Sequence, residues 1–207
     1  MTAAILGKKV GMTSLFTERG AKVPVTVIQA GPCTITQIKT MKTDGYSAVQ
    51  LGFEEIPDRK VNKPLAGHFA KAGSKPMRTL KEFRDMNVDF NEGDQITVEQ
   101  FTIGEKVKIS GTGKGRGFQG VVKRHHFKGV GMATHGQKDR QRHGGSVGQS
   151  SWPSRILKGV RMPGRMGGKR VTISNIEVMD IISDQNIIIV KGCLPGPINS
   201  LLEIVKR

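Results

Sequence analysis

Two parts of the chain alternate apolar and polar residues, and the long stretch between them does not. Before residue 111 the alternation has a period of two and favours β-branched residues, as in strands that bury one face. It covers residues 23–29, 33–39, 46–53, 95–101 and 106–110, and returns in 171–182, 186–191 and 201–205. Turn-forming residues such as Gly31-Pro32 separate these segments. The pattern predicts a mainly β fold, with a closed or nearly closed antiparallel barrel built from both ends of the chain.

Residues 57–94 interrupt the strand pattern with a polar, lysine-rich sequence. Within them we expect two short helices, at 64–72 and 78–84. The predicted globular domain therefore consists of residues 1–110 and 171–207 and carries a small α-containing insertion at about 57–94. Residues 111–170 leave and re-enter this domain between two of its strands.

The positive charge is concentrated in residues 111–170. The chain has 33 Lys and Arg against 17 Asp and Glu, a formal charge of +16; this segment holds 14 of the cations and one acid, Asp139, a net +13. It also holds 15 of the 27 glycines but only three aromatic residues. So few apolar side chains cannot offset the entropy of ordering the segment by itself. We expect a basic arm, held at both ends, that becomes ordered against nucleic-acid phosphates.

Other partners and compartments fit the sequence less well. The N-terminal stretch MTAAILGKKVGM lacks the apolar core of a signal peptide, and the longest aliphatic run, residues 187–190, is far too short to span a membrane. Cys33 and Cys193 are 160 positions apart. We expect two buried thiols rather than a disulfide, although pairing in space stays open. The expected compartment is the cytosol, without membrane contact.

Three patterns in the arm that resemble sites for chemistry are each incomplete. Gly115, Gly117 and Gly120 have the GxGxxG spacing of a dinucleotide-binding loop, but a Lys-Arg-His-His run follows where an amphipathic helix is required. The four histidines of the arm have no cysteine near them and no spacing typical of a zinc site. The serines near His143 lack a complete triad and a GxSxG motif. We therefore expect no enzyme activity, no cofactor, no metal and no small-molecule substrate.

RNA binding explains the composition of the arm more simply. Glycines let the backbone approach RNA closely, while Lys114 and Arg116 neutralise phosphates. Trp152, the single tryptophan, lies in a polar stretch that offers little core to enter, so stacking on an unpaired base is favoured over a core position. Four cations then recur every three or four residues: Arg155, Lys158, Arg161 and Arg165. The prolines and glycines among them favour an extended strand that follows phosphates over a helix.

Nine blocks of the sequence resemble the ribosomal protein L3 family (universal family uL3), in order and along nearly the whole chain. They are GKKVGMTSLFTERG at 7–20, PVTVIQAGPCTITQIKT at 24–40, DGYSAVQLGF at 44–53, NKPLAGHFAKAG at 62–73, GTGKGRGFQGVVKRHHF at 111–127, ATHG at 133–136, GSVGQ at 145–149, SRILKGVRMPGRMGGKRVT at 154–172 and IIIVKG at 187–192. So many ordered blocks are more specific than any single motif.

This resemblance implies a translation-protein-type barrel and a structural role in the large ribosomal subunit. It implies primary binding to 23S ribosomal RNA near its 3′ end, nucleation of subunit assembly, and an arm that reaches toward the peptidyl-transferase centre. Residues 144–154 would form the arm tip, with Gln149 and Trp152 deepest in RNA. The ribosomal proteins L14 and L19 are implied neighbours. Ser151 stands where some bacterial members carry a methylated glutamine, Pro163 replaces a small residue, and Trp152 is bulkier than the usual residue.

The candidate RNA-binding residues combine these interpretations. They are Lys8, Lys9, Lys114, Arg116, Lys123, Arg124, His126, Lys128, His135, Lys138, Arg140, Arg142, His143, Gln149, Trp152, Arg155, Lys158, Arg161, Arg165, Lys169 and Arg170. A general nucleic-acid chaperone or DNA-compacting protein is the alternative, because the same charge would serve it. Selectivity separates the two, since a ribosomal protein binds one folded RNA region far better than duplex DNA.

Overall fold

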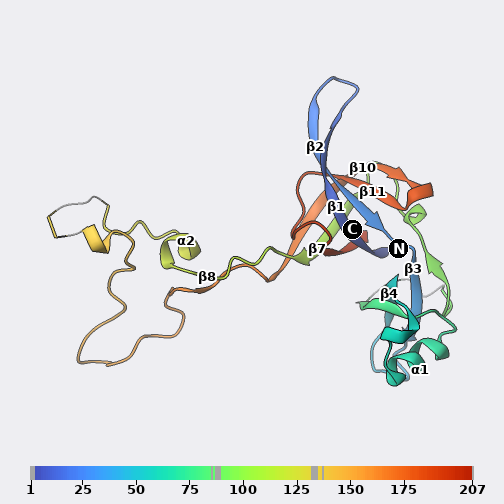
Figure 1. Cartoon of the computed structure of the whole chain (residues 1–207), viewed down its shortest axis with the longest axis horizontal. Helices are drawn as coiled ribbons and strands as arrows, with labels where there is room; N and C mark the ends of the chain where they lie inside the picture. Colours follow the sequence, from blue (N-terminus) through green and yellow to red (C-terminus); the bar gives the residue numbers. More distant parts are fainter. Residues whose placement is uncertain (1–2, 85, 87–89, 132–134, 137, 207) are drawn as a thin grey trace. The chain divides into compact units, whose positions relative to one another are not determined.

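The protein consists of two compact units. The computed structural model describes residues 3–84, 86, 90–131, 135–136 and 138–206. Unit 1 comprises Met1–Gly113 and Arg170–Arg207, and unit 2 comprises Lys114–Lys169. Unit 1 contains two β-sheets and a helix, whereas unit 2 is mostly irregular chain (Figure 1).

A closed barrel of six antiparallel strands forms the larger part of unit 1. Its order is β1-β12-β7-β10-β11-β2. The strands are β1 (Ala4–Phe16), β2 (Lys22–Ala30), β7 (Lys106–Thr112), β10 (Arg170–Ile182), β11 (Ile187–Lys191) and β12 (Leu201–Lys206). The barrel predicted from both ends of the chain is therefore confirmed. Its strands contribute fully buried aliphatic residues to the core, among them Ile28, Ile109, Ile188 and Ile204.

Strands β7 and β10 are neighbours in the barrel, and the chain leaves unit 1 from the end of one and returns at the start of the other. Thr112 of β7 is paired with Arg170 of β10. The two points at which the chain crosses into unit 2 are therefore fixed beside each other by the hydrogen-bonding ladder of unit 1.

The alternation pattern does not predict β1, because its first residues are buried on both faces. Ala4, Ile5 and Leu6 are consecutive and each is 0% exposed, so the strand shows no period of two. Gly7 lies tightly against β2: a Cβ at this position would be 2.8 Å from Ile28 Cγ2. Pairing with both β12 and β2 stabilises this segment, and only the closed barrel supplies both partners.

Unit 1 also contains a second sheet, with the order β5-β4-β3-β6. Its strands are β3 (Cys33–Lys39), β4 (Ala48–Glu55), β5 (Met77–Arg84) and β6 (Gln95–Ile96). The expectation that residues 33–39, 46–53 and 95–101 belong to the barrel is therefore wrong. Alternation indicates that a strand buries one face, but it does not say with which sheet the strand pairs. One hydrophobic core joins both sheets, with Ile35 and Leu51 packed in the same cluster as Ile5 and Ile28.

The segment 57–94 contains one of the two predicted helices. The helix expected at 64–72 is confirmed as α1 (Lys63–Lys71); the Asn62 side chain accepts a hydrogen bond from Leu65 N at 3.2 Å, and Phe69 is buried. The helix expected at 78–84 is wrong, because these residues form β5, where Phe83 pairs with Val49 of β4. Its charged residues are good helix formers, but pairing along β4 outweighs this local preference.

Short 3-10 turns complete unit 1. They are η1 (Asp58–Lys60), η2 (Val98–Gln100) and η4 (Ser183–Gln185). The turn η2 replaces the second half of the strand expected at 95–101, because β6 ends after two residues.

The two cysteines of unit 1 are unpaired and differ in exposure, so the expectation of two buried thiols is wrong for one of them. Cys33 is 0% exposed and Cys193 is exposed. Burial raises the pKa of the Cys33 thiol to about 12, which keeps it protonated at neutral pH. We expect a disulfide-exchange reagent to titrate one thiol quickly in the native protein and two after unfolding in urea. Two fast thiols in the native protein would contradict the buried position of Cys33.

Candidate RNA-binding interface

Unit 2 has almost no core of its own. Among its described residues, Val121 is the only one that is buried. The regular structure found there comprises the paired two-residue strands β8 (Phe118–Gln119) and β9 (Gly164–Arg165), the helix α2 (Val121–His125) and the 3-10 turn η3 (Lys138–Arg140). So little apolar burial cannot offset the entropy of ordering the segment. This is the physical basis for expecting a partner to order it.

Backbone contacts connect the outgoing and returning segments of unit 2. Beside the β8–β9 pair, Arg116 N donates to Met166 O and Met166 N donates to Gly117 O, both at 2.9 Å. The two segments therefore run together without needing packed side chains, which leaves their side chains available to a partner.

Two glycines of unit 2 allow backbone segments to approach closely. Gly167 has a φ of +73°, and a Cβ there would lie 2.0 Å from Lys114 O. Gly129 has a φ of +75°, and its Cβ would lie 1.9 Å from Gln141 O. Only glycine fits either position. These glycines therefore have a role within the chain, beside the expected close approach to RNA.

Helix α2 is anchored to the returning segment by two of its basic residues. Arg124 Nη1 donates to Met162 O at 2.6 Å, and His125 Nε2 lies 3.1 Å from the same oxygen. Arg124 Nη1 is thus engaged within unit 2, and RNA contact by the other donors of this guanidinium stays a prediction. The helix has five residues, so the GxGxxG motif before it is not followed by the long helix of a dinucleotide site.

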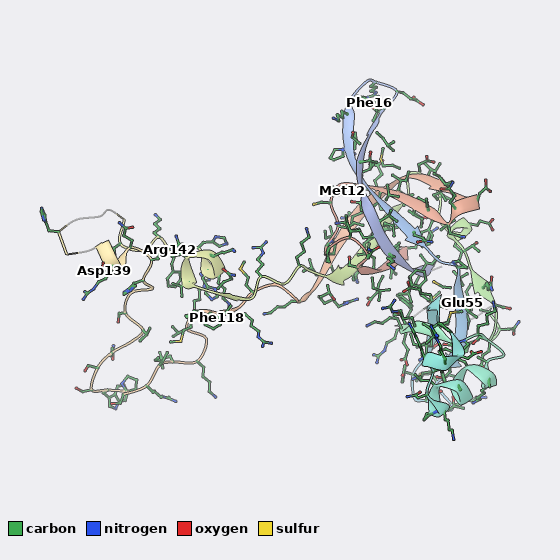
Figure 2. All side chains as sticks on the ribbon, viewed as in Figure 1. Met12, Phe16, Glu55, Phe118, Asp139 and Arg142 are labelled. Atoms are coloured by element: carbon green, nitrogen blue, oxygen red, sulfur yellow. The ribbon has the colours of Figure 1, made fainter. Side chains whose placement is uncertain are left out.

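Ten basic side chains of unit 2 are exposed and have no hydrogen-bond or ion-pair partner within the described part of the chain. They are Lys114, Lys123, Lys128, Arg140, Arg142, Arg155, Lys158, Arg161, Arg165 and Lys169. Asp139 is the one acidic residue of the unit's sequence. The side chains of Asp139 and Arg142 are both exposed to solvent (Figure 2). Such a surface is strongly positive and lacks internal neutralisation.

The remaining polar candidates in unit 2 are exposed as well. The predicted histidines His126, His135 and His143 and the amide of Gln149 are all at the surface. The backbone of Lys138 lies in η3, but its side chain is outside the described residues, as are residues 133–134 of the ATHG block. Arg116 is exposed too, and its guanidinium makes only a long contact, 3.9 Å, to Met166 Sδ.

Two large aromatic side chains of unit 2 face solvent. Trp152 is 82% exposed and Phe118 is 72% exposed. The position of Trp152 excludes the alternative that it anchors a core of this chain. Phe118 (Figure 2) is a further stacking candidate that the sequence interpretation missed. The signal was present in its setting, because it is an aromatic residue between glycines and an arginine (Arg116-Gly-Phe-Gln-Gly120).

The candidate Lys9 has an internal role instead. Its side chain is 7% exposed, and its ammonium group donates to Leu194 O at 2.9 Å and to Gly196 O at 3.4 Å. A buried ammonium bonded to its own chain cannot reach a phosphate without unfolding the loop that it holds. These internal bonds argue against RNA contact by Lys9, which stays an untested prediction.

The candidates Lys8 and Arg170 also have partners within unit 1. Lys8 Nζ lies 3.1 Å from Glu54 Oε1, and Arg170 forms an ion pair with Glu203. Both side chains are partly open to solvent, and exposed pairs of this kind hold their partners weakly. They stay candidates, but with part of their charge already neutralised.

The described residues contain neither a cluster suited to a metal ion nor a membrane-spanning helix. Among them, no three His, Cys, Asp or Glu side chains come together as a metal site would need. No helix in the described part of the chain has the length and apolar character needed to cross a membrane.

Comparison with known proteins identifies the family. Residues 71–186, more than half of the chain, match the family described as Ribosomal protein L3. The chain is 51% identical over 208 residues to the large ribosomal subunit protein uL3 of Salinibacter ruber, and the match covers 100% of both proteins. That family is structural and is not a family of enzymes, and a large-subunit ribosomal protein is cytoplasmic in bacteria. The chain therefore belongs to the ribosomal protein L3 family and is a structural constituent of the large ribosomal subunit.

Proposed function

We propose that unit 2 inserts into folded ribosomal RNA of the large subunit while unit 1 anchors both of its ends. The observation that supports this most directly is the set of ten exposed, partnerless cations on a unit with one buried described residue. Phosphates supply the missing counter-charge, and each neutralised phosphate releases condensed counterions. The exposed aromatic residues Trp152 and Phe118 add stacking surface for unpaired bases.

The ordered blocks shared with the L3 family support a finer proposal. The chain binds 23S ribosomal RNA near its 3′ end, nucleates subunit assembly, and directs residues 144–154 toward the peptidyl-transferase centre. Unit 2 is the RNA-penetrating arm in this proposal, and unit 1 is the globular anchor.

Protein neighbours would bind unit 1, with L14 and L19 as the expected ones. Its β1–β2 hairpin projects from the barrel and exposes Met12 and, near the tip, Phe16, which are 51% and 73% exposed (Figure 2). Exposed large apolar side chains on one element favour contact with another protein.

Charge neutralisation within unit 2 tests the proposal. The triple variant Arg155→Gln/Lys158→Gln/Lys169→Gln should weaken binding to large-subunit ribosomal RNA and lower the slope of log K against log salt by about 2–3. The matched control, Lys60→Gln/Lys63→Gln/Lys71→Gln, removes the same charge from exposed positions of unit 1. It should change the slope by less than about 1.

If the two triple variants lose the same affinity and the same salt slope, a specific role of unit 2 is refuted, because only total charge would then matter. Competition with duplex DNA distinguishes selective binding of ribosomal RNA from the alternative, a general nucleic-acid chaperone. The proposed function requires that excess duplex DNA leave the ribosomal RNA complex largely intact.

A further inference from the structure

Unit 2 contains a concave pocket of about 860 Å³, formed by segments on either side of α2 and by the returning chain. Its apolar lining includes Val121, Phe127, Val147, Val160 and Met162. Arg140, Arg142 and Arg161 line the same pocket. An apolar surface bordered by three arginines therefore lies within one unit of the protein.

Part of this lining is exposed although it is apolar. Val147 is 50% exposed and Val160 is 40% exposed. Apolar side chains that remain open in a strongly basic unit are stabilised when a ligand covers them. The ligand must also carry negative charge. A neutral ligand would remove water from the arginines without supplying a counter-charge to the guanidinium groups.

Hydrogen bonds within unit 2 hold the walls of the pocket. Val130 N donates to Gln141 O at 3.3 Å, across the close contact at Gly129. The bonds of Arg124 and His125 to Met162 O attach the returning wall to α2. Gly144 lies against Val121, since a Cβ at this glycine would be 3.2 Å from Val121 Cγ2. The concave shape is thus built by specific contacts.

We propose that this pocket binds an unstacked nucleotide of the ribosomal RNA, with the base against the valine and phenylalanine side chains and the phosphates on the arginines. A nucleotide joins the flat face of a base, which packs on apolar side chains, to an anionic phosphate, which matches both parts of the lining. A volume of about 860 Å³ accommodates a base with its ribose and phosphates. An apolar peptide would cover the floor but leave the arginines without counter-charge. This inference rests on the proposed insertion of unit 2 into ribosomal RNA.

Filling the pocket without changing its charge tests the inference in the full-length chain. Val160→Phe should weaken binding to large-subunit ribosomal RNA by roughly 5- to 100-fold, the range for loss of one base contact, and leave the salt slope unchanged. Leu157→Phe is the matched control, because Leu157 is an exposed aliphatic residue of the same unit, 61% exposed, that does not line the pocket. It should bind like the unaltered chain. Arg142→Gln should lower both the affinity and the slope, the latter by about 1.

Chemical probing of base reactivity in the complex gives a second measurement. The unaltered chain and Leu157→Phe should protect the same one or two bases, and Val160→Phe should restore their reactivity. Val147→Phe fills the pocket from another wall and should repeat the result if Val160→Phe does not fold. Unchanged affinity and unchanged base reactivity in both filling variants would overturn the inference. Failure of the proposed function gives a different outcome. In that case removal of residues 114–169 will leave the salt dependence of RNA binding unchanged.

Discussion

Replacing residues 113–169 by Asn-Gly should leave a folded unit 1 and lower the affinity for large-subunit ribosomal RNA by about 1,000-fold or more at moderate salt. The replacement removes the ten partnerless cations together with Trp152. Unit 1 should tolerate the change because Thr112 and Arg170 are directly paired, and a two-residue loop is the shortest natural connection between paired antiparallel strands.

Two measurements check this result. Filter binding to large-subunit ribosomal RNA across a salt series should give a slope of log K against log salt that is smaller by several units. Thermal unfolding of the shortened protein should stay cooperative, which shows that the loss of affinity is not a loss of fold. A shortened protein that binds with the original slope would mean that unit 1 carries the electrostatic contact, and the proposed role of unit 2 would fail.

Substitution of Gly7 by alanine should destabilise unit 1 by about 1–3 kcal/mol, whereas substitution of Gly11 by alanine should not. Both glycines lie on β1. The added Cβ at Gly7 would be 2.8 Å from Ile28 Cγ2, 2.9 Å from Gln29 O and 3.2 Å from Ala30 Cα, so backbone atoms must move. At Gly11 the added Cβ meets no atom within 4 Å.

Urea unfolding of the two variants provides the comparison. Alanine restricts the unfolded chain equally at both positions, which stabilises the folded state by about 0.4–1 kcal/mol in each. The difference between the variants therefore reports the steric contact alone. If Gly7→Ala and Gly11→Ala have the same midpoint, the close approach of β1 to β2 at Gly7 is not a constraint on the barrel.

The local pattern of the sequence was sufficient for most strands but not for their partners. Residues 33–39 alternate as clearly as 23–29, yet β3 pairs in the second sheet while β2 closes the barrel. The alternation of a strand reports burial of one face, and pairing depends on segments that are distant in sequence. The same reason explains β5, where residues suited to a helix form a strand along β4.

The charge pattern predicts an interface in residues 111–170 but does not distinguish exposed cations from those bonded within the chain. Lys9 and Arg124 are ordinary basic residues in the sequence, and each donates to backbone carbonyls of its own chain. Those carbonyls belong to residues 185 positions away in one case and 38 in the other. Such pairings arise only when the chain has folded.

The order of the residues alone predicts a β-rich domain made from both ends of the chain and a basic segment with too few apolar residues to order itself. These properties follow from composition and short-range periodicity, which no packing arrangement can change. The division of the strands between two sheets, the internal bonds of Lys9 and Arg124, and the pocket of unit 2 emerge only in the folded chain. Each of these depends on contacts between residues far apart in sequence, and local patterns contain no information about them.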